Sequence, residues 1–353
     1  MIVIGTDPHK DNHTAVAADC ATGELRSSER VAASPAGHEV LLGWARELDS
    51  ERVWAIEDCR HVSGALERFL VARGEHVVRV APKLMAGARR GGRERGKSDP
   101  IDAAAVARAA LREGIENLPG AHLDEEALEL RLLLDHREDL VGESTRIQNR
   151  LLWHLHDLDP ALAPRRRGLT AKRIRRSLQA RLARREQCVR TGIARELLGR
   201  LSALCAREAE LEAEIARRAE AQAPQLLALP GCGPLTAAKL IAECAGAERF
   251  STDAKLARAA GVAPLPVSSG RSDRHRLDRG GNRQLNCAFH RIAVTQARVH
   301  PEAQAFLERK RAEGKSNREA LRCLKRHIVR RVHRLLTQSP TQANAPDGAL
   351  ALT

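Results

Sequence analysis

Four carboxylates are spaced as a metal site at the edge of a β-sheet would require. Asp7 ends a short β-branched run that begins at Ile2, and Glu57 ends a second apolar run. Asp99 and Asp102 lie three residues apart at the start of a helix-like segment, so a helix would place both on one face. Hard carboxylate oxygens suit divalent magnesium, which assists reactions at phosphate. The set is typical of metal-dependent nucleases and recombinases.

Each of these acids also has a simpler explanation. Asp99 followed by Pro100 is a good helix start, with Asp99 as N-cap and Asp102 favoured by the helix dipole. Asp7 and Glu57 taken singly could be solvated acids at strand ends. The ordered set of strand acid, strand acid and helix acid pair favours the metal site.

The elements expected to position these acids form an α/β domain over residues 1–118. Asp7 should lie on the first strand of a hairpin, because a polar stretch separates it from the next apolar segment. The expected strands are 2–6, 14–18, 53–57 and 76–81, and the expected helices are 36–48, 62–73 and 100–113.

A loop rich in glycine and arginine precedes the acidic helix. Next to a metal site it could hold a phosphate backbone, and a plain flexible loop is the alternative. Its candidate nucleic-acid-binding residues are Arg89, Arg90, Arg93, Arg95 and Lys97.

Composition indicates a polyanionic partner. Among 353 residues, Lys and Arg outnumber Asp and Glu by 59 to 45, and the sequence pI is about 10.1. The eight cysteines include no Cys-x-x-Cys pair, so reduced thiols are expected. Tyrosine is absent, which excludes a tyrosine nucleophile, and the few Phe and Trp make base stacking a minor contribution. No segment has the ~20 apolar residues of a membrane helix, so a cytoplasmic, nucleoid-associated protein without a membrane partner is expected.

The middle of the chain, residues 119–223, is predicted to be all-α. Leucines at three- and four-residue spacing indicate two long helices, either an antiparallel hairpin, a coiled-coil dimer seam or ordinary amphipathic helices. The strongly basic stretch between them is interpreted as a phosphate-binding surface, plausibly for structured RNA. Its candidate residues are Arg165, Arg166, Arg167, Arg173 and Arg176.

A third, mainly helical region is expected over residues 224–337. Gly231 and Gly233 bracket a turn of the helix-hairpin-helix kind, which could present backbone amides to DNA phosphate or serve as a packing turn. The stretch Ser268-Ser269-Gly270-Arg271 suggests a flexible polar loop, with Arg271 as a further nucleic-acid contact. A basic helical stretch follows over 309–334, and the tail 338–353 is expected to be disordered.

Five motifs in order resemble the DEDD transposases of the insertion-sequence-110 family over residues 1–335. The motifs are Gly5-Thr6-Asp7-Pro8-His9-Lys10, Ala55-Ile56-Glu57, Lys97-Ser98-Asp99-Pro100-Ile101-Asp102-Ala103, Leu229-Pro230-Gly231-Cys232-Gly233-Pro234 and Ala260-Gly261-Val262-Ala263-Pro264 leading to Ser269-Gly270.

The resemblance implies a ribonuclease-H-like (RuvC-like) N-terminal domain and a C-terminal transposase domain. It implies that Asp7, Glu57, Asp99 and Asp102 hold Mg²⁺, with Mn²⁺ as a substitute. It also implies that Ser269 attacks a DNA phosphate and that a structured RNA from the element guides the reaction. A dimer or tetramer is expected, because recombination joins two DNA partners and needs four strand events.

This sequence departs from the family pattern at two places. It reads Asp58-Cys59-Arg60-His61 where an aromatic residue is usual, and Asn286 follows Leu285 where arginine is common. Ser268 remains a second candidate nucleophile. Two other functions remain open: a structure-selective RuvC-like nuclease that uses metal-activated water, and a DNA-binding protein without catalysis.

Overall fold

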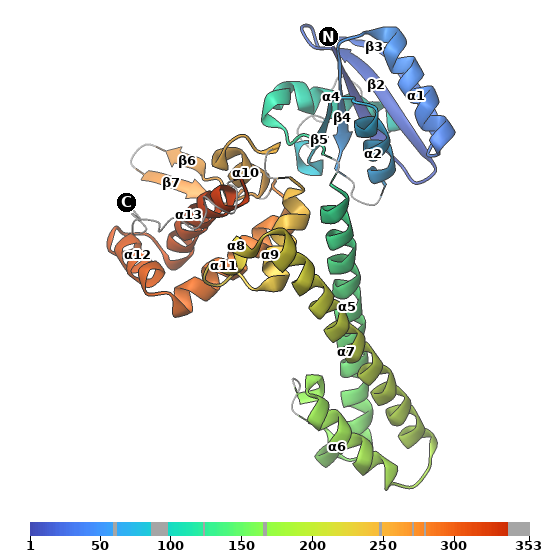
Figure 1. Cartoon of the computed structure of the whole chain (residues 1–353), viewed down its shortest axis with the longest axis vertical. Coiled ribbons are helices and arrows are strands. Elements are labelled where there is room, and N and C mark those ends of the chain that lie inside the picture. Colours follow the sequence, from blue (N-terminus) through green and yellow to red (C-terminus); the bar gives the residue numbers. More distant parts are fainter. Residues whose placement is uncertain are drawn as a thin grey trace. The chain divides into compact units, whose positions relative to one another are not determined.

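The computed structural model forms two compact units (Figure 1). Unit 1 comprises residues 1–125, 228–232 and 243–353, and unit 2 comprises residues 126–227 and 233–242. The expected division at 118, 223 and 337 stays a prediction. The structure describes residues 1–58, 62–85, 98–122, 124–164, 168–246, 249–269, 272–278 and 280–337.

Unit 1 begins with a five-stranded sheet in the order β3-β2-β1-β4-β5. β2 is antiparallel to both β1 and β3, whereas β4 runs parallel to β1 and β5 parallel to β4. This mixed α/β arrangement is compatible with a ribonuclease-H-like domain. Its elements are β1 (Ile2–Pro8), β2 (Asn12–Asp19), β3 (Leu25–Ala32), α1 (Pro35–Leu48), β4 (Arg52–Glu57), α2 (Gly64–Ala72), β5 (Val77–Val80), α4 (Asp99–Glu113) and η1 (Ile115–Asn117).

Helices cover both faces of this sheet (Figure 1). On one face, Leu41 of α1 and Leu66 of α2 share a core with Ile2 and Ile4 of β1. On the other face, Val3 packs with the alanines of α4. Because successive residues of a strand face opposite sides, β1 needs an unbroken apolar run to enter both cores.

The expected strands and helices of the first domain are confirmed, apart from one strand that was missed. β3 did not stand out because only Val31 of its eight residues is buried. It is an edge strand, and polar side chains on an edge are how sheets avoid pairing with other chains.

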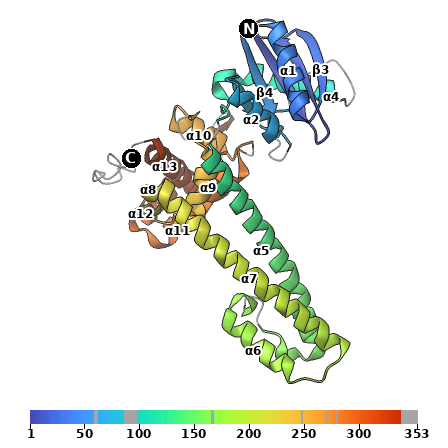
Figure 2. The same ribbon diagram turned by 45° about the vertical axis from the view of Figure 1, so that its right-hand side comes forward.

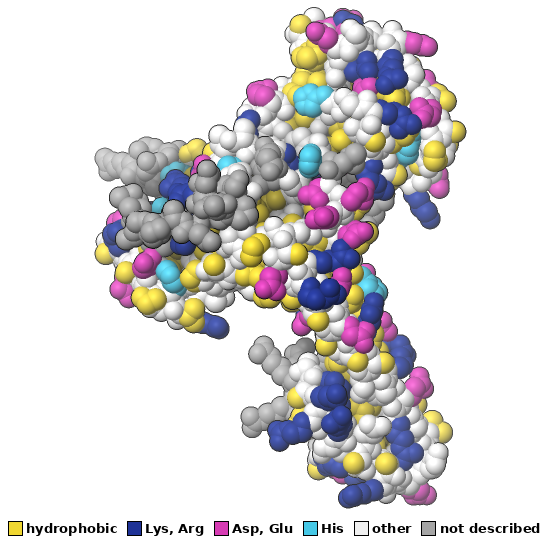
Figure 3. Space-filling view, in the orientation of Figure 1, with side chains coloured by type: hydrophobic (Ala, Val, Ile, Leu, Met, Phe, Trp, Pro, Cys, Tyr) yellow, Lys and Arg dark blue, Asp and Glu magenta, His cyan; other side chains and the backbone are white. Residues whose placement is uncertain are grey.

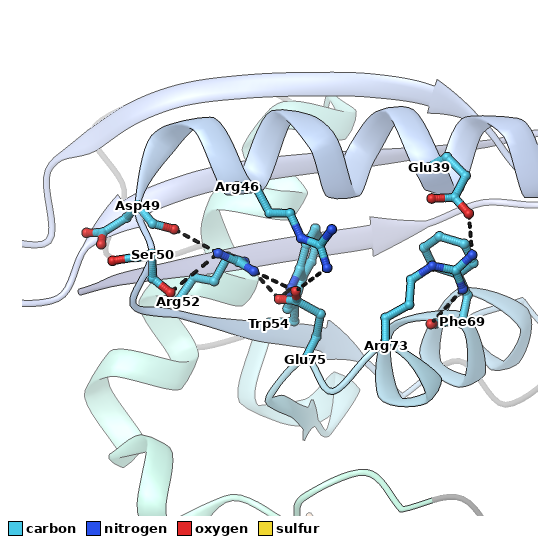
Figure 4. A network of polar contacts seen from close by, with 9 residues as sticks. All are labelled: Glu39, Arg46, Asp49, Ser50, Arg52, Trp54, Phe69, Arg73 and Glu75. Carbon is cyan, nitrogen blue, oxygen red and sulfur yellow. Dashed lines mark hydrogen bonds and ion pairs between the residues drawn. The ribbon is translucent and has the colours of Figure 1, made fainter.

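A buried carboxylate fastens β4 to the segment before β5 (Figure 4). Glu75 accepts hydrogen bonds from Arg52 Nε at 2.8 Å and from Trp54 Nε1 at 3.0 Å. Burial alone would raise the pKa of Glu75, but these hydrogen bonds outweigh it and lower the pKa. The ion pair therefore supports the strand that carries Glu57.

Unit 2 is helical, and its two longest helices run antiparallel (Figure 2). Arg218 contacts Glu129 at 2.5 Å, and Arg200 contacts Glu143 at 3.3 Å, so residue numbers fall along one helix as they rise along the other. The expectation of two long helices is confirmed. Unit 2 contains most of α5 (Glu125–Leu158) and α9 (Pro234–Cys244), with η2 (Pro160–Leu162), η3 (Gly168–Thr170), α6 (Lys172–Ala183), α7 (Val189–Gln222) and α8 (Pro224–Leu227).

The C-terminal part of unit 1 is helical with one β-hairpin. The expected loop at Ser268-Ser269 is wrong: this segment lies in strand β6, paired with β7, because backbone pairing compensates for its few strand-forming residues. The expected basic helical stretch 309–334 is confirmed, and it spans two helices that separate at Gly314, where φ is +83°. The elements are α10 (Asp253–Ala259), β6 (Leu265–Ser269), β7 (Ser272–Arg276), α11 (Arg283–Val299), α12 (Pro301–Ala312) and α13 (Asn317–Thr337).

None of the helices in the described residues is both long and apolar enough to cross a membrane. The expected disordered tail, 338–353, lies outside the described residues.

Candidate functional site

The first acid of the predicted tetrad is buried near the end of β1. Asp7 pairs in register with Thr14 of β2, which confirms the predicted hairpin, and it is only 5% exposed. Burial raises the pKa of Asp7, His9 acts to lower it, and the charges of Asp102 and Asp99 raise it further. A cation at this position would relieve both the burial and the repulsion.

Helix α4 reaches Asp7 because glycine occupies position 5. A Cβ on Gly5 would lie 2.8 Å from the Ala107 Cβ and still closer to the backbone of Ala103. The helix therefore packs its backbone directly on β1, a contact that only glycine permits. The N-cap of α4 is Ser98, whose backbone is extended, and Asp99 is already helical, so the simpler explanation of Asp99 as N-cap is wrong.

Three side chains form a group that could hold a metal ion. Ligand atoms of Asp7, His9 and Asp99 all lie within 4.8 Å of one another. His9 Nε2 is 3.1 Å from Asp7 Oδ2 and 3.6 Å from Asp99 Oδ1. Arg30 of β3 also reaches Asp99, at 3.4 Å.

His9 was not among the residues predicted from the sequence. Its position two residues after Asp7 is the only available signal, and a polar turn contains many such residues. The turn between the antiparallel strands β1 and β2 brings the His9 side chain within hydrogen-bonding distance of the Asp7 carboxylate. Residue spacing alone does not reveal this contact.

The other two acids of the predicted tetrad lie on neighbouring elements. Thr6 of β1 pairs with Ile56 of β4 in the parallel ladder. The next residues along the two strands are Asp7 and Glu57, so these acids occupy matching positions on neighbouring strands. Asp102 is 6% exposed and lies one turn after Asp99 in α4. The expected shared face of Asp99 and Asp102 is confirmed, and the four acids occur on three adjoining elements.

This donor set fits a divalent cation. It offers carboxylate oxygens from strand β1 and helix α4, with the imidazole of His9 beside them. Oxygen-rich sets suit Mg²⁺ and Mn²⁺, while imidazole is tolerated better by Mn²⁺.

Most predicted nucleic-acid contacts remain predictions. Arg173 and Arg176 are exposed on α6, whereas Arg175 is buried and donates to the Leu169 and Thr170 carbonyls. The candidates outside the described residues are Arg89, Arg90, Arg93, Arg95, Lys97, Arg165, Arg166, Arg167 and Arg271.

The glycines of the predicted DNA-binding turn differ from each other. Gly231 has φ +81°, and a Cβ there would lie 3.0 Å from the Ile292 carbonyl, so packing on α11 already explains this glycine. Nothing lies within 4 Å of a Cβ built on Gly233. Of the two, Gly233 has the backbone exposed to space that a phosphate contact needs.

The hairpin of β6 and β7, here called the serine hairpin because β6 contains Ser268 and Ser269, is closed at its base by contacts between glycine backbones. Gly261, at φ +62°, precedes β6 and packs on Gly281, which follows β7. Asn286 Nδ2 donates to the carbonyls of Ala260 at 2.9 Å and Gly261 at 3.0 Å, and its Oδ1 accepts from Lys325 at 2.7 Å. The unusual Asn286 thus holds the segment that leads to Ser269.

Comparison with known proteins identifies the family of this chain. Residues 4–160 match a family model of transposases, and residues 223–308 match the IS116/IS110/IS902 transposase family. A 44.8 kDa protein of insertion element IS116 from Streptomyces clavuligerus is 31% identical over 93% of this chain and 92% of its own length. A 43.6 kDa protein of insertion element IS110 from Streptomyces coelicolor is 34% identical over 66% of this chain and 69% of its own.

A more distant relative, a 42 kDa protein of insertion element IS900 from Mycobacterium paratuberculosis, is 26% identical over 91% of this chain and 92% of its own. The protein is a transposase, an enzyme that cuts and rejoins DNA. The chain belongs to the IS116/IS110/IS902 family, whose membership implies a DNA substrate and the use of a divalent metal.

Proposed function

We propose that this transposase excises and inserts its element by magnesium-dependent strand cleavage and exchange at the acid cluster, through a covalent serine–DNA intermediate. The observation that carries the proposal is the convergence of Asp7 and Asp99, with His9, within 4.8 Å in a chain of this family. Asp7 is buried beside the charges of Asp102 and Asp99, an arrangement that is costly unless a cation binds there.

The acids Asp7, Glu57, Asp99 and Asp102 would hold the Mg²⁺, and Mn²⁺ would substitute. The bound ion supplies Lewis-acid stabilisation of charge on the phosphate oxygens. His9 hydrogen bonds to Asp7 and fixes the orientation of that carboxylate, while Arg30 restrains Asp99. These contacts hold the acids in place before DNA arrives, which reduces the reorganisation needed for reaction.

In the proposed first step, the Ser269 oxygen forms a bond to a DNA phosphorus. The bond from phosphorus to one deoxyribose oxygen breaks, and this oxygen leaves as a hydroxyl once protonated. Attack by a hydroxyl of the partner strand then releases the serine and joins the two DNAs. A serine hydroxyl is a weak nucleophile, so it requires activation, which we assign to the acid-bound metal.

The partners are DNA ends and target DNA, a structured guide RNA and further copies of the chain. The basic helices of unit 2 and the net charge of +14 support a polyanionic partner. Recombination joins two DNA partners and needs four strand events, which supports a dimer or tetramer. Domains over 1–118, 119–223 and 224–337 would divide metal binding, RNA binding or dimerisation, and nucleophilic attack.

The test is a search for the covalent adduct. Purified full-length protein is mixed with labelled DNA that carries the element ends, RNA transcribed from the element's noncoding end, and Mg²⁺. A denaturing gel should show a protein–DNA band with wild type and Ser268→Ala, and none with Ser269→Ala or Asp7→Asn. Cleavage by Ser269→Ala at the wild-type rate without an adduct would instead establish the hydrolytic nuclease.

A further inference from the structure

Unit 2 divides sharply into a basic part and an acidic part. Residues 141–200, here called the basic half, contain 15 lysines and arginines against 5 aspartates and glutamates. The remaining residues of the two long helices and α8, 126–140 and 201–227, contain 5 against 10. Because α5 and α7 are antiparallel, their basic portions lie at the same end, together with α6 (Figures 1 and 3). The excess positive charge is therefore local.

One aromatic side chain is exposed within this basic half. Trp153 of α5 is 73% exposed, and it is the only Phe, Trp or Tyr between residues 126 and 227. The other two tryptophans lie in the N-terminal sheet domain, where Trp54 is fully buried and Trp44 donates a hydrogen bond to Ser27. The core of unit 2 thus does not use its single aromatic residue.

Trp153 belongs to an exposed stripe along α5. Arg146, Arg150, Trp153 and His156 follow the three- and four-residue spacing of one helix face and are all exposed. The opposite face of α5 presents Ile147, Leu151 and Leu155, which pack in a core with residues of α7. The stripe covers about 15 Å of helix, with the two guanidinium groups before the indole and the imidazole of His156 after it.

The chemistry of this stripe fits a single-stranded nucleic acid. An exposed indole offers a flat surface for an unpaired base, and the guanidinium groups one and two turns before it can contact the neighbouring phosphates. A second copy of the same surface would bring two strongly positive patches together, which disfavours self-association there. Charge complementarity therefore selects a polyanion that also has accessible bases.

We propose that Arg146, Arg150, Trp153 and His156 form a stacking site for an unpaired base of single-stranded nucleic acid. The proposal deepens the proposed function, since it assigns to this site an unpaired segment of the guide RNA. Trp153 stacks on the base, and Arg146 and Arg150 bind the neighbouring phosphates. The site needs no sequence preference, because every base offers a π-face.

The test measures binding of labelled oligouridylate to the full-length protein by fluorescence anisotropy. Trp153→Ala should weaken binding about 5- to 150-fold, because stacking on an aromatic is worth roughly 1–3 kcal/mol per base, and Trp153→Phe should recover most of it. Leu132→Ala is the matched control, since Leu132 is also exposed on α5 but lies in the acidic part. It should bind as wild type.

Two further measurements test the phosphate contacts and the choice between RNA and DNA. Arg150→Gln should reduce the slope of log affinity against log salt by about 0.7, the value for one phosphate contact of a single strand. Tighter binding of oligouridylate than of oligodeoxythymidylate assigns the site to RNA, and equal binding assigns it to single strands of either kind.

Wild-type affinity in Trp153→Ala, or a loss of self-association in that variant by sedimentation with RNA affinity unchanged, would overturn the proposal. The assay requires no DNA cleavage. Its failure would therefore leave the transposase mechanism standing, and failure of the adduct test would leave this site standing.

Discussion

Replacement of Gly5 by alanine should separate the two elements that bring the acids together. The added Cβ would lie 2.8 Å from the Ala107 Cβ and closer still to backbone atoms of α4, whereas ordinary contact begins at 3.4 Å. Backbone cannot rotate away as a flexible side chain can, so α4 must retreat by more than half an ångström. Asp99 and Asp102 move with it, away from Asp7.

Two effects of known size follow. Overpacking of a core typically costs about 1–3 kcal/mol of unfolding free energy, and a displacement near 1 Å in a catalytic constellation can lower rate by about 100-fold. Gly5→Ala should therefore lose stability in urea unfolding and lose excision more severely than that stability loss explains.

The matched control is Gly43→Ala. Gly43 lies within α1 and has nothing within 4 Å of an added Cβ, so alanine should stabilise the protein by about 0.5–1 kcal/mol and leave excision unchanged. Wild-type stability and wild-type excision in Gly5→Ala would refute the claim that a direct backbone contact positions the acids.

Three further predictions concern stability. Burial and the neighbouring His38 lower the pKa of His13 from 6.5 to about 4, so the unfolded chain binds a proton that the folded chain does not. The free energy of unfolding is therefore unaffected by His13 above pH 6.5, and it falls by up to about 3 kcal/mol as the pH falls from 6.5 to 4. His13→Gln should reduce this fall in urea titrations at a series of pH values. Glu75→Leu should cost about 1–3 kcal/mol, because Arg52 Nε and Trp54 Nε1 lose their acceptor, and Glu75→Gln clearly less, by thermal unfolding. Asn286→Ala should lower the free energy of unfolding by roughly 1–3 kcal/mol and speed proteolysis of the serine hairpin. A wild-type rate of proteolysis would contradict the anchoring role of Asn286.

The acid positions could be predicted because strand ends and helix starts are local signals. Asp7 and Glu57 each end an apolar run, and parallel strands bring such ends to the same sheet edge. Asp99 and Asp102 follow from helical spacing. His9 could not be predicted, since its approach to Asp7 depends on the turn between β1 and β2.

The parts that were missed depend on pairing between segments. β3 and the β6–β7 hairpin contain few strand-forming residues and exist because a neighbouring strand supplies hydrogen bonds. The role of Asn286 likewise depends on residues 25 or more positions away in the chain. Sequence spacing does not report such contacts.

The most direct test of the central claim is excision in cells. The circular junction formed by the element with its native flanks is amplified for wild type, Asp7→Asn, Asp99→Asn and the control Asp11→Asn, whose exposed carboxylate lies in the same β1–β2 turn. We expect circles from wild type and Asp11→Asn, and none from the two site variants when all four proteins accumulate equally. Circles from Asp7→Asn at the wild-type level would contradict a catalytic metal site at the end of β1.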